Sequence, residues 1–271
     1  MTVAKHIAAA FTLPLALLAS VPAVAGVGDL LVAPTRIVLN GSRGAEVVLS
    51  NIGDETATYR VSVELRRMRP DGALEEVTAA NDKEQKAHDM IVYAPRRVTI
   101  APNQPQTIRI SARAPQGLPD GEYRAHMLFR AVPPPRPVRP AAEVKGIAFE
   151  LIPVYGVTIP VVIRMGNLQA KVGIANIQLT RQDDKPAISL DLTRNGDRSV
   201  FGDVRVFKAG FKDPIAIQRG VAVYTEIGTR HMVIPISADF AGSAAGPVTV
   251  DFVETGDAGP VSLAETKTVL R

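Results

Sequence analysis

The stretch VKGIAFELIPVYGVTIPVVIR, residues 144–164, is the longest apolar run after the first 25 residues. It opens with strict alternation, since Ile147, Phe149 and Leu151 share one side and Glu150 lies on the other. This period of two predicts a β-strand with two unlike faces. The rest of the run is almost continuously apolar, which is typical of a strand covered on both faces.

Two prolines within this run limit where the strand can lie in a sheet. Pro153 and Pro160 lack the N–H that a central strand donates, so we expect an edge strand or one broken by bulges. An edge strand with bulky apolar side chains must be covered, either by another part of the chain or by another protein. The alternating apolar side chains could also pack wholly inside their own sandwich, and both interpretations stay open.

The first 25 residues predict a secretory signal peptide. Lys5 lies in a short charged region, Ile7–Leu18 is apolar, and the triplet AVA at residues 23–25 is a small-x-small cleavage site. A membrane anchor is disfavoured, because the apolar region is short and prolines interrupt it. We therefore expect export to a bacterial periplasm, with a mature chain of about 245 residues, enough for two domains.

The composition disfavours several classes of function. With no Cys there is neither a disulfide framework nor a thiolate metal site. A net charge of +4 gives no nucleic-acid footprint. His88, His126 and His231 lack metal-ligand spacing, and no nucleophile elbow or phosphate loop is present. We expect no enzyme, cofactor or metal site.

Short strand-like segments separated by turns fill both halves of the chain. In the first half they are Leu30–Leu39, Ala45–Ser50, Ala57–Arg66, Ile91–Ile100 with a break at Pro95, Thr107–Ala112 and Glu122–Val132. In the second half they are Ala170–Gln178, Ala187–Arg194, Val200–Val206, Ile215–Tyr224, His231–Ile236, Pro247–Phe252 and Val261–Leu270. Thr78–Ala87 is expected to be a loop with at most one helical turn. This pattern predicts an all-β chain of two β-sandwiches.

The proline-rich segment PPPRPVRP, residues 133–140, is expected to be extended. It is either an interdomain linker or a long loop, and the loop is favoured because the first sandwich needs residues 144–164 as its closing strand. We therefore expect immunoglobulin-like domains at residues 26–165 and 166–271, with the boundary near Met165–Leu168.

Several short motifs in the first half occur together in a fixed order. They are Arg36 within APTRIVLNG, Ser50-Asn51, the block from Pro95 to Ile110, and the block LPDGEYR at residues 118–124 followed by Phe129 and Pro133. In order and spacing they resemble the periplasmic pilus chaperones, the PapD-like family of chaperone–usher systems. The second half resembles this family only in length and type.

The resemblance implies a mechanism and a set of partners. Such chaperones hold a pilus subunit whose sandwich lacks its last strand, by adding a strand of their own, and deliver it to an outer-membrane usher. On this basis Ile147, Phe149 and Leu151 would fill the subunit's groove. Arg36 would bind the subunit's C-terminal carboxylate in a cleft between two angled domains. Independently of the resemblance, a self-capping homodimer would be one physically reasonable way to cover the strand without a client.

One departure from the family concerns the second anchoring group. The family has a Lys on the strand before the hinge, where this sequence has Thr158 or Pro160. Either Arg164 substitutes, or Arg36 acts alone, or the client differs from an ordinary subunit. Arg36 could also be a plain interdomain ion-pair residue.

Two other classes of protein compete with a chaperone. A structural subunit or adhesin is the first, although such subunits usually carry a disulfide and this chain has no Cys. An enzymatic or carbohydrate-binding sandwich is the second, and it is disfavoured because the chain has no Trp and only 5% aromatic residues.

Overall fold

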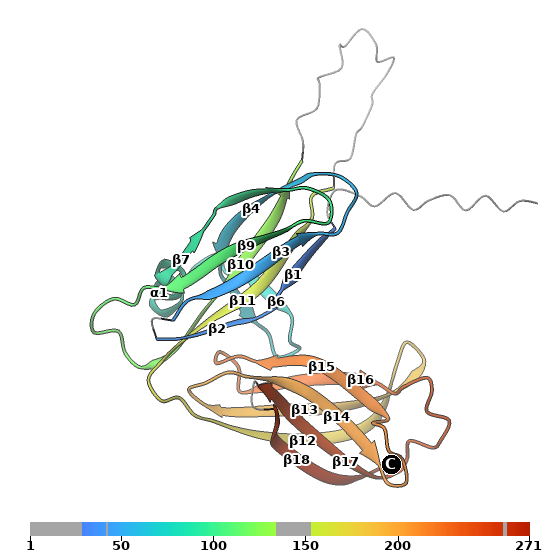
Figure 1. Cartoon of the computed structure of the whole chain (residues 1–271). Coiled ribbons are helices and arrows are strands. Elements are labelled where there is room, and N and C mark those ends of the chain that lie inside the picture. Colours follow the sequence, from blue (N-terminus) through green and yellow to red (C-terminus); the bar gives the residue numbers. More distant parts are fainter. Residues whose placement is uncertain (1–28, 42, 134–152, 257–258) are drawn as a thin grey trace, which may run out of the picture.

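The computed structural model describes residues 29–41, 43–133, 153–256 and 259–271 (Figure 1). These residues form two β-sandwiches in tandem, as the sequence predicts. The expected signal peptide at residues 1–25 lies outside the described residues. So do most of the proline-rich segment and Ile147, Phe149 and Leu151. Within the described ranges, no helix is long and apolar enough to cross a membrane.

The first sandwich consists of two sheets with the strand orders β1-β3-β9-β7 and β2-β11-β10-β4-β8. Its elements are β1 (Leu30–Ala33), β2 (Ile37–Asn40), β3 (Ala45–Asn51), β4 (Ala57–Glu64), β5 (Arg66–Met68), β6 (Leu74–Glu76), α1 (Asp82–Met90), β7 (Ile91–Ala94), β8 (Arg97–Ile100), β9 (Pro105–Ala112), β10 (Gly121–Val132) and β11 (Gly156–Met165). This order corresponds to the ABED and CFG sheets of an immunoglobulin fold. Tyr123 at the start of β10 donates a hydrogen bond to the Pro119 carbonyl at 2.8 Å, as in the tyrosine corner of such domains.

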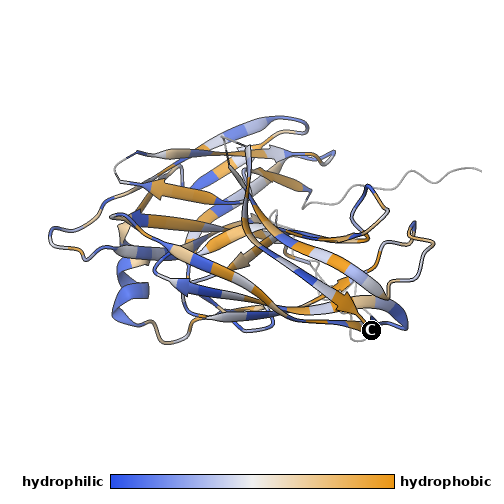
Figure 2. Ribbon diagram, turned by 90° about the horizontal axis from the view of Figure 1, so that it is seen from below, coloured by the Kyte–Doolittle hydropathy of each residue, from blue (hydrophilic) through white to orange (hydrophobic). Residues whose placement is uncertain are grey.

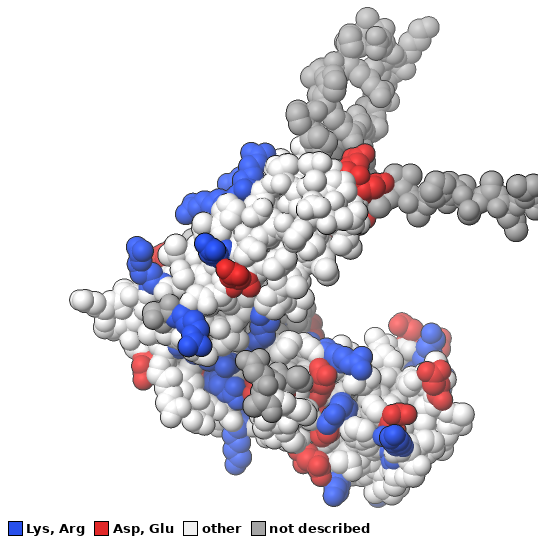
Figure 3. All heavy atoms as spheres, viewed as in Figure 1, with Lys and Arg blue, Asp and Glu red and all other residues white. Residues whose placement is uncertain are grey.

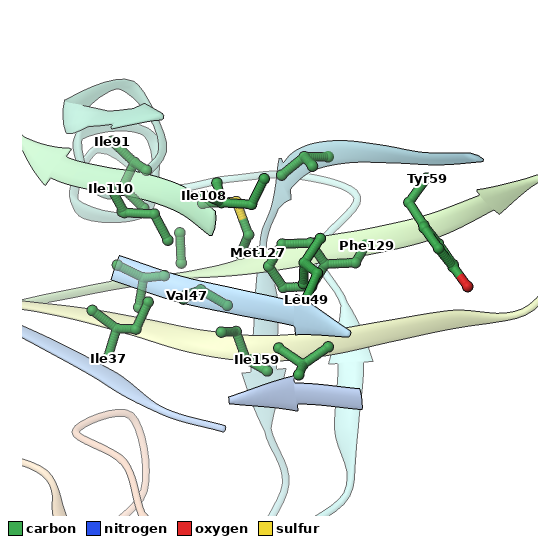
Figure 4. Close-up of a cluster of buried hydrophobic side chains, with 14 of the residues drawn as sticks. Ile37, Val47, Leu49, Tyr59, Ile91, Ile108, Ile110, Met127, Phe129 and Ile159 are labelled. Carbon is green, nitrogen blue, oxygen red and sulfur yellow. The ribbon is translucent and has the colours of Figure 1, made fainter. Parts of the chain in front are cut away.

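The core of the first sandwich lies between these two sheets. Alternate residues of each strand point inward, so that Leu49, Tyr59, Met127, Phe129 and Ile159 are almost fully buried (Figure 4). Burial of a large apolar side chain stabilises the fold by about 1.5–3 kcal/mol. This core therefore stabilises β11, and its buried residues all come from the first sandwich.

The closing strand β11 is only partly the edge strand that its prolines predict. It pairs with β10 along its whole length, from Met165 opposite Gly121 to Gly156 opposite Arg130. On its other side β2 pairs with it in parallel, but only at Val161–Arg164. The prediction of an edge strand is thus wrong for Val161–Arg164. It holds for Gly156–Pro160, which have β10 as their one neighbour among the described residues.

The segment Leu30–Leu39, expected as one strand, and the segment Ile91–Ile100, expected to break at Pro95, each divide between the two sheets. Residues 30–39 form β1 in one sheet and β2 in the other, and the chain crosses at Pro34. Residues 91–100 divide in the same way at Pro95 into β7 and β8. Proline cannot donate to a ladder, which explains why each strand ends there.

The helix α1 replaces an expected loop. Asn81 caps it by accepting from the Glu84 N–H at 2.9 Å, and the Glu84 side chain accepts from the Asn81 N–H at 2.8 Å. This capping box is a helix-start signal in the sequence. Ala87 and Met90 are buried against the first core, so tertiary packing stabilises a short helix that its polar sequence leaves weak.

The second sandwich has the sheet orders β12-β13-β16 and β15-β14-β17-β18. Its strands are β12 (Ala170–Gln182), β13 (Lys185–Gly196), β14 (Val200–Lys208), β15 (Ala216–Val223), β16 (Thr229–Pro235), β17 (Gly246–Gly256) and β18 (Gly259–Leu270), which confirms the segments expected in this half. Figure 2 shows apolar and polar residues alternating along these ribbons. Its core residues run from Ile174 to Leu270, whereas those of the first core run from Val32 to Ile163.

Candidate binding site at the junction of the two sandwiches

The two sandwiches meet around Ser199, which directly precedes β14 and is fully buried. Its N–H donates to Glu122 Oε2 at 3.0 Å, and its carbonyl accepts from Arg164 Nη2 at 3.1 Å. Its hydroxyl accepts from Arg36 Nη2 at 3.3 Å. Every polar group of Ser199 is therefore hydrogen-bonded to the first sandwich. Figure 3 shows the open hollow between the two sandwiches.

Glu122 and Arg164 form an ion pair inside this junction. They lie directly opposite each other on β10 and β11, and Arg164 Nε donates to Glu122 Oε2 at 3.1 Å. The Glu122 side chain is only 1% exposed and that of Arg164 is 17% exposed. A buried pair of this kind is costly to break, because the remaining charge has no partner. Arg164 therefore has a structural role at the hinge in this structure.

Arg36 precedes β2 and extends to the second sandwich. Its guanidinium carbon lies 4.8 Å from the centroid of the Phe201 ring, a cation–π distance. Its Nη1 is buried and has no hydrogen-bond partner among the described residues. Burial lowers the pKa of Arg36, and the neighbouring Tyr224 and Glu122 oppose that change. An unsatisfied buried donor costs about 1–3 kcal/mol, and a bound acceptor would remove that cost.

The charges at the junction are suited to one anion. Arg36 and Arg164 supply two positive charges and Glu122 one negative charge, which leaves one net positive charge beside Ser199. A carboxylate would match this charge and could accept two hydrogen bonds from a guanidinium fork.

The position of Arg36 relative to β11 indicates where a strand that carries such a carboxylate would lie. Pairing between β2 and β11 starts at Ile37 opposite Val161, and Arg36 is the residue just before it. The position next to β11 that β2 occupies at Val161–Arg164 holds no described strand beside Gly156–Pro160. We call this vacant strand position the open lane. A further strand in that lane would therefore end against Arg36.

A second contact joins the sandwiches through the β5–β6 hairpin. The Met68 N–H donates to Glu226 Oε1 at 2.8 Å, and the same oxygen accepts from Arg124. The His231 N–H donates to the Pro70 carbonyl at 2.7 Å. These bonds fix the hairpin of the first sandwich on the second.

An apolar cluster lies beneath this contact. Met68 packs with Ala222 and Tyr224, and all three are buried. The guanidinium carbon of Arg124 lies 3.8 Å from the centroid of the Tyr224 ring. Burial raises the pKa of Tyr224, so the ring remains neutral. The contact thus combines apolar burial with an ion pair.

His126 is fully buried at the edge of the same region. Its Nδ1 has no hydrogen-bond partner within the described ranges, and its ring meets Tyr224 edge to face at a centroid distance of 6.4 Å. Burial, followed by the charges of Arg124 and Arg66, lowers the pKa of His126 to about 3. It is therefore a neutral core histidine. In the described part of the chain, no group of His, Asp or Glu side chains is arranged to hold a metal.

The structure brings two of the predicted site residues together. Arg36 and Arg164 both bind Ser199, whereas Ile147, Phe149 and Leu151 lie outside the described residues. Sequence reasoning missed Ser199 and Phe201, because Ser199 is 163 positions from Arg36 and carries no motif. Glu122 falls in the LPDGEYR block, which could have marked it.

Comparison with known proteins gives matches at the level of structure alone. No family model matches the chain, and no curated protein matches it. Similar solved structures include the YadV chaperone, with 15% identity, a TM-score of 0.48, and coverage of 89% of this chain and 100% of that one. The E. coli chaperone DraB has 14% identity, a TM-score of 0.46, and coverage of 89% and 98%.

A third similar structure is the Salmonella enterica SafA pilin in complex with the SafB chaperone. It shows 14% identity and a TM-score of 0.44, and the match covers 90% of this chain and 98% of that chain. With identities and TM-scores this low, the fold assignment rests on the strand order and the two cores described above.

Proposed function

We propose that this protein is a non-enzymatic periplasmic chaperone that holds a pilus subunit by strand addition and delivers it for assembly of a surface fibre. The observation that carries the proposal is the open lane beside Gly156–Pro160, which ends at Arg36. An unpaired strand edge attracts another strand, and backbone hydrogen bonds then supply affinity.

The lane also sets the direction of the added strand. If the client's C-terminal carboxylate binds Arg36, its last strand runs from the level of Gly156 toward Pro160. That is the direction of β11 itself, so the pair is parallel. The carboxylate would accept charge-assisted hydrogen bonds, including one from Nη1.

Residues before β11 in the sequence extend the proposed site. Ile147, Phe149 and Leu151 alternate, and we propose that their side chains enter the client's groove while the backbone continues the open edge. The proposal includes removal of residues 1–25 and domains at residues 26–165 and 166–271. It also includes delivery to an outer-membrane usher, and self-capping as a homodimer without client.

We assign the anchoring role to Arg36 and a supporting role to Arg164. Pro160 has no basic group, and the Arg164 guanidinium is already bonded to Glu122 and Ser199. The stack on Phe201 and the bond to Ser199 hold the Arg36 fork in one orientation. A pre-organised fork loses less side-chain entropy when a carboxylate binds.

The test is recovery of a client from periplasmic extract with tagged wild-type protein, Arg36→Ala, Arg36→Lys and a control, Arg113→Ala, at an exposed arginine. We expect Arg36→Ala to reduce recovery at least about tenfold, Arg36→Lys to be intermediate, and the control to match wild type. A synthetic peptide of the client's C-terminal residues should compete with a free carboxylate and fail when amidated. Equal recovery with Arg36→Ala would contradict the anchor.

A further inference from the structure

A row of three arginines crosses the outer face of the sheet, away from the junction. Arg60 on β4 lies directly opposite Arg130 on β10 and directly opposite Arg97 on β8. All three are exposed, whereas their sequence neighbours Tyr59 and Val98 are buried in the core. The three side chains therefore point to solvent from adjacent strands at one level of the sheet.

This arrangement repels itself. Residues directly opposite on neighbouring strands have Cβ atoms about 4.5–5.5 Å apart, and like charges there are destabilising. Among the described residues, no acidic side chain forms an ion pair with any of the three arginines.

The cross-strand neighbours on either side of this row, which form the next levels of the sheet, do not offset the repulsion between the arginines. One consists of Thr58, Val132 and Thr99, and the other includes Ser62 and Leu128. These levels contain neither a carboxylate nor an aromatic ring on which a nucleobase could stack. In the part of the chain that the structure describes, the row is therefore a positive stripe whose two neighbouring levels carry no charge.

The other arginines within the strands of this sandwich have acidic partners. Arg109 lies opposite Glu46 and binds it at 3.2 Å on the other sheet. Arg66 binds Glu64 at 2.6 Å, and Arg124 binds Glu226. Within the described ranges, the stripe is thus an exception among the strand arginines of this sandwich, which otherwise pair with acids.

The stripe begins at the open edge of β11. Arg130 is directly opposite Gly156, the first residue of the unpaired part of that strand. Gly156 has no side chain, so nothing on β11 separates the stripe from the lane in which a client strand would lie. A client strand paired there would have only β11 between it and Arg130, so the Arg130 end of the stripe is the part nearest to the client.

We propose that this stripe docks an acidic β-sheet surface of the client, next to the strand that pairs with β11; the identity of the partner rests on the proposed function. Carboxylates on neighbouring strands of the client would be about 4.7–4.9 Å apart, the spacing of the arginines across β10, β4 and β8. A planar guanidinium fork binds a carboxylate with two hydrogen bonds, so three arginines in a row select a row of acids.

A defined probe tests the stripe without the client. The probe is labelled poly-L-glutamate, and its binding to the mature protein is measured by fluorescence anisotropy at low and high salt. The triple variant Arg60→Ser/Arg97→Ser/Arg130→Ser should bind about tenfold more weakly at low salt, since exposed ion pairs each contribute about 0.2–1 kcal/mol.

A control removes the same charge elsewhere. The triple variant Arg43→Ser/Arg113→Ser/Arg219→Ser changes three other exposed arginines and should stay within about twofold of wild type. Equal losses in the two triple variants would overturn the proposal, because net charge alone would then explain binding. Vesicles containing phosphatidylglycerol form a second probe. If only vesicle binding depends on the stripe, its ligand is a lipid headgroup and the proposal is overturned.

The proposed role of the arginine stripe and the proposed role of Arg36 can be refuted independently of each other. Arg36→Ala should leave poly-L-glutamate binding unchanged even where it abolishes client recovery. The stripe variant should weaken recovery of the client, and unchanged recovery would overturn the docking role. Its melting temperature at low salt should equal or exceed that of wild type, because repulsion is removed. A lower melting temperature would show that the arginines stabilise the sheet instead.

Discussion

The two halves of β11 differ sharply although they belong to one strand. Val161–Arg164 lie between β10 and β2, and Val161 and Ile163 are fully buried. Gly156–Pro160 pair with β10 alone among the described residues. One half is fixed in the sandwich and tied to the second sandwich through Arg164, whereas the other offers a row of unpaired backbone groups.

The second sandwich shows how such an edge is avoided. There β18, at the end of one sheet, lies beside β12 of the other, and Thr266 Oγ1 donates to the Ile174 carbonyl at 3.3 Å. Likewise, Ala216 at the start of β15 forms an isolated bridge with Ile236, just after β16. Sheets that close on each other leave few free backbone groups. In the first sandwich, by contrast, no described strand lies beside Gly156–Pro160 on the side away from β10.

The largest expected loss of stability comes from breaking the ion pair that Arg164, in the fixed half of β11, forms with Glu122 on β10. Glu122→Ala leaves the Arg164 charge without its partner and removes the acceptor of the Ser199 N–H. We expect the free energy of unfolding to fall by about 3–5 kcal/mol, measured by urea denaturation. In the second sandwich, Asp251→Ala breaks the more exposed pair with Arg205 and should cost only about 1 kcal/mol. Similar losses in the two variants would contradict the special position of the junction.

A smaller effect concerns the border between the halves, where His126 lies opposite Pro160. Its pKa of about 3 in the folded protein is well below the usual 6.5. The unfolded chain therefore binds a proton that the folded protein does not. His126 therefore does not lower the free energy of unfolding above pH 6.5, and lowers it progressively as the pH falls from 6.5 toward 3.

Between pH 7 and pH 5, His126 should cost the folded protein about 2 kcal/mol. His126→Gln removes the titrating group and should lose correspondingly less stability over this range. Urea denaturation of both proteins at the two pH values gives the comparison. Identical pH dependence would mean that His126 is protonated in the folded state or accessible to water.

The smallest effect separates the hydroxyl of Ser199 from its backbone. Ser199→Ala removes only the bond to Arg36, since the bonds to Glu122 and Arg164 use the main chain. The free energy of unfolding should fall by about 1 kcal/mol, and client recovery should remain within about threefold of wild type. Loss of recovery as large as that of Arg36→Ala would move the binding role to the hydroxyl.

Much of the fold could be predicted because strand signals are local. Alternation and turn residues located every strand of the second sandwich. They predicted the break at Pro95 but not the one at Pro34. At neither proline did they predict the change of sheet, since a crossing depends on packing between sheets that a strand pattern does not report. The helix α1 was missed although Asn81 and Glu84 form a capping box.

The site could be predicted only in part, because its contacts are long-range. Arg36 was found from the motif around it, and its position before β2 explains its place at the end of the lane. Ser199 and Phe201 come from the second sandwich, and nothing in their local sequence marks them as partners of Arg36. The half-open state of β11 depends on how far β2 extends, which is a property of the assembled sheet.

The most direct test of the account is hydrogen–deuterium exchange of the peptide that covers Gly156–Met165, in the protein alone and with the recovered client bound. We predict that amides in Val157–Ile159 gain protection on binding, whereas Val161–Arg164 exchange slowly in both states. Unchanged exchange at Val157–Ile159, with new protection confined to the second sandwich, would contradict strand addition at β11.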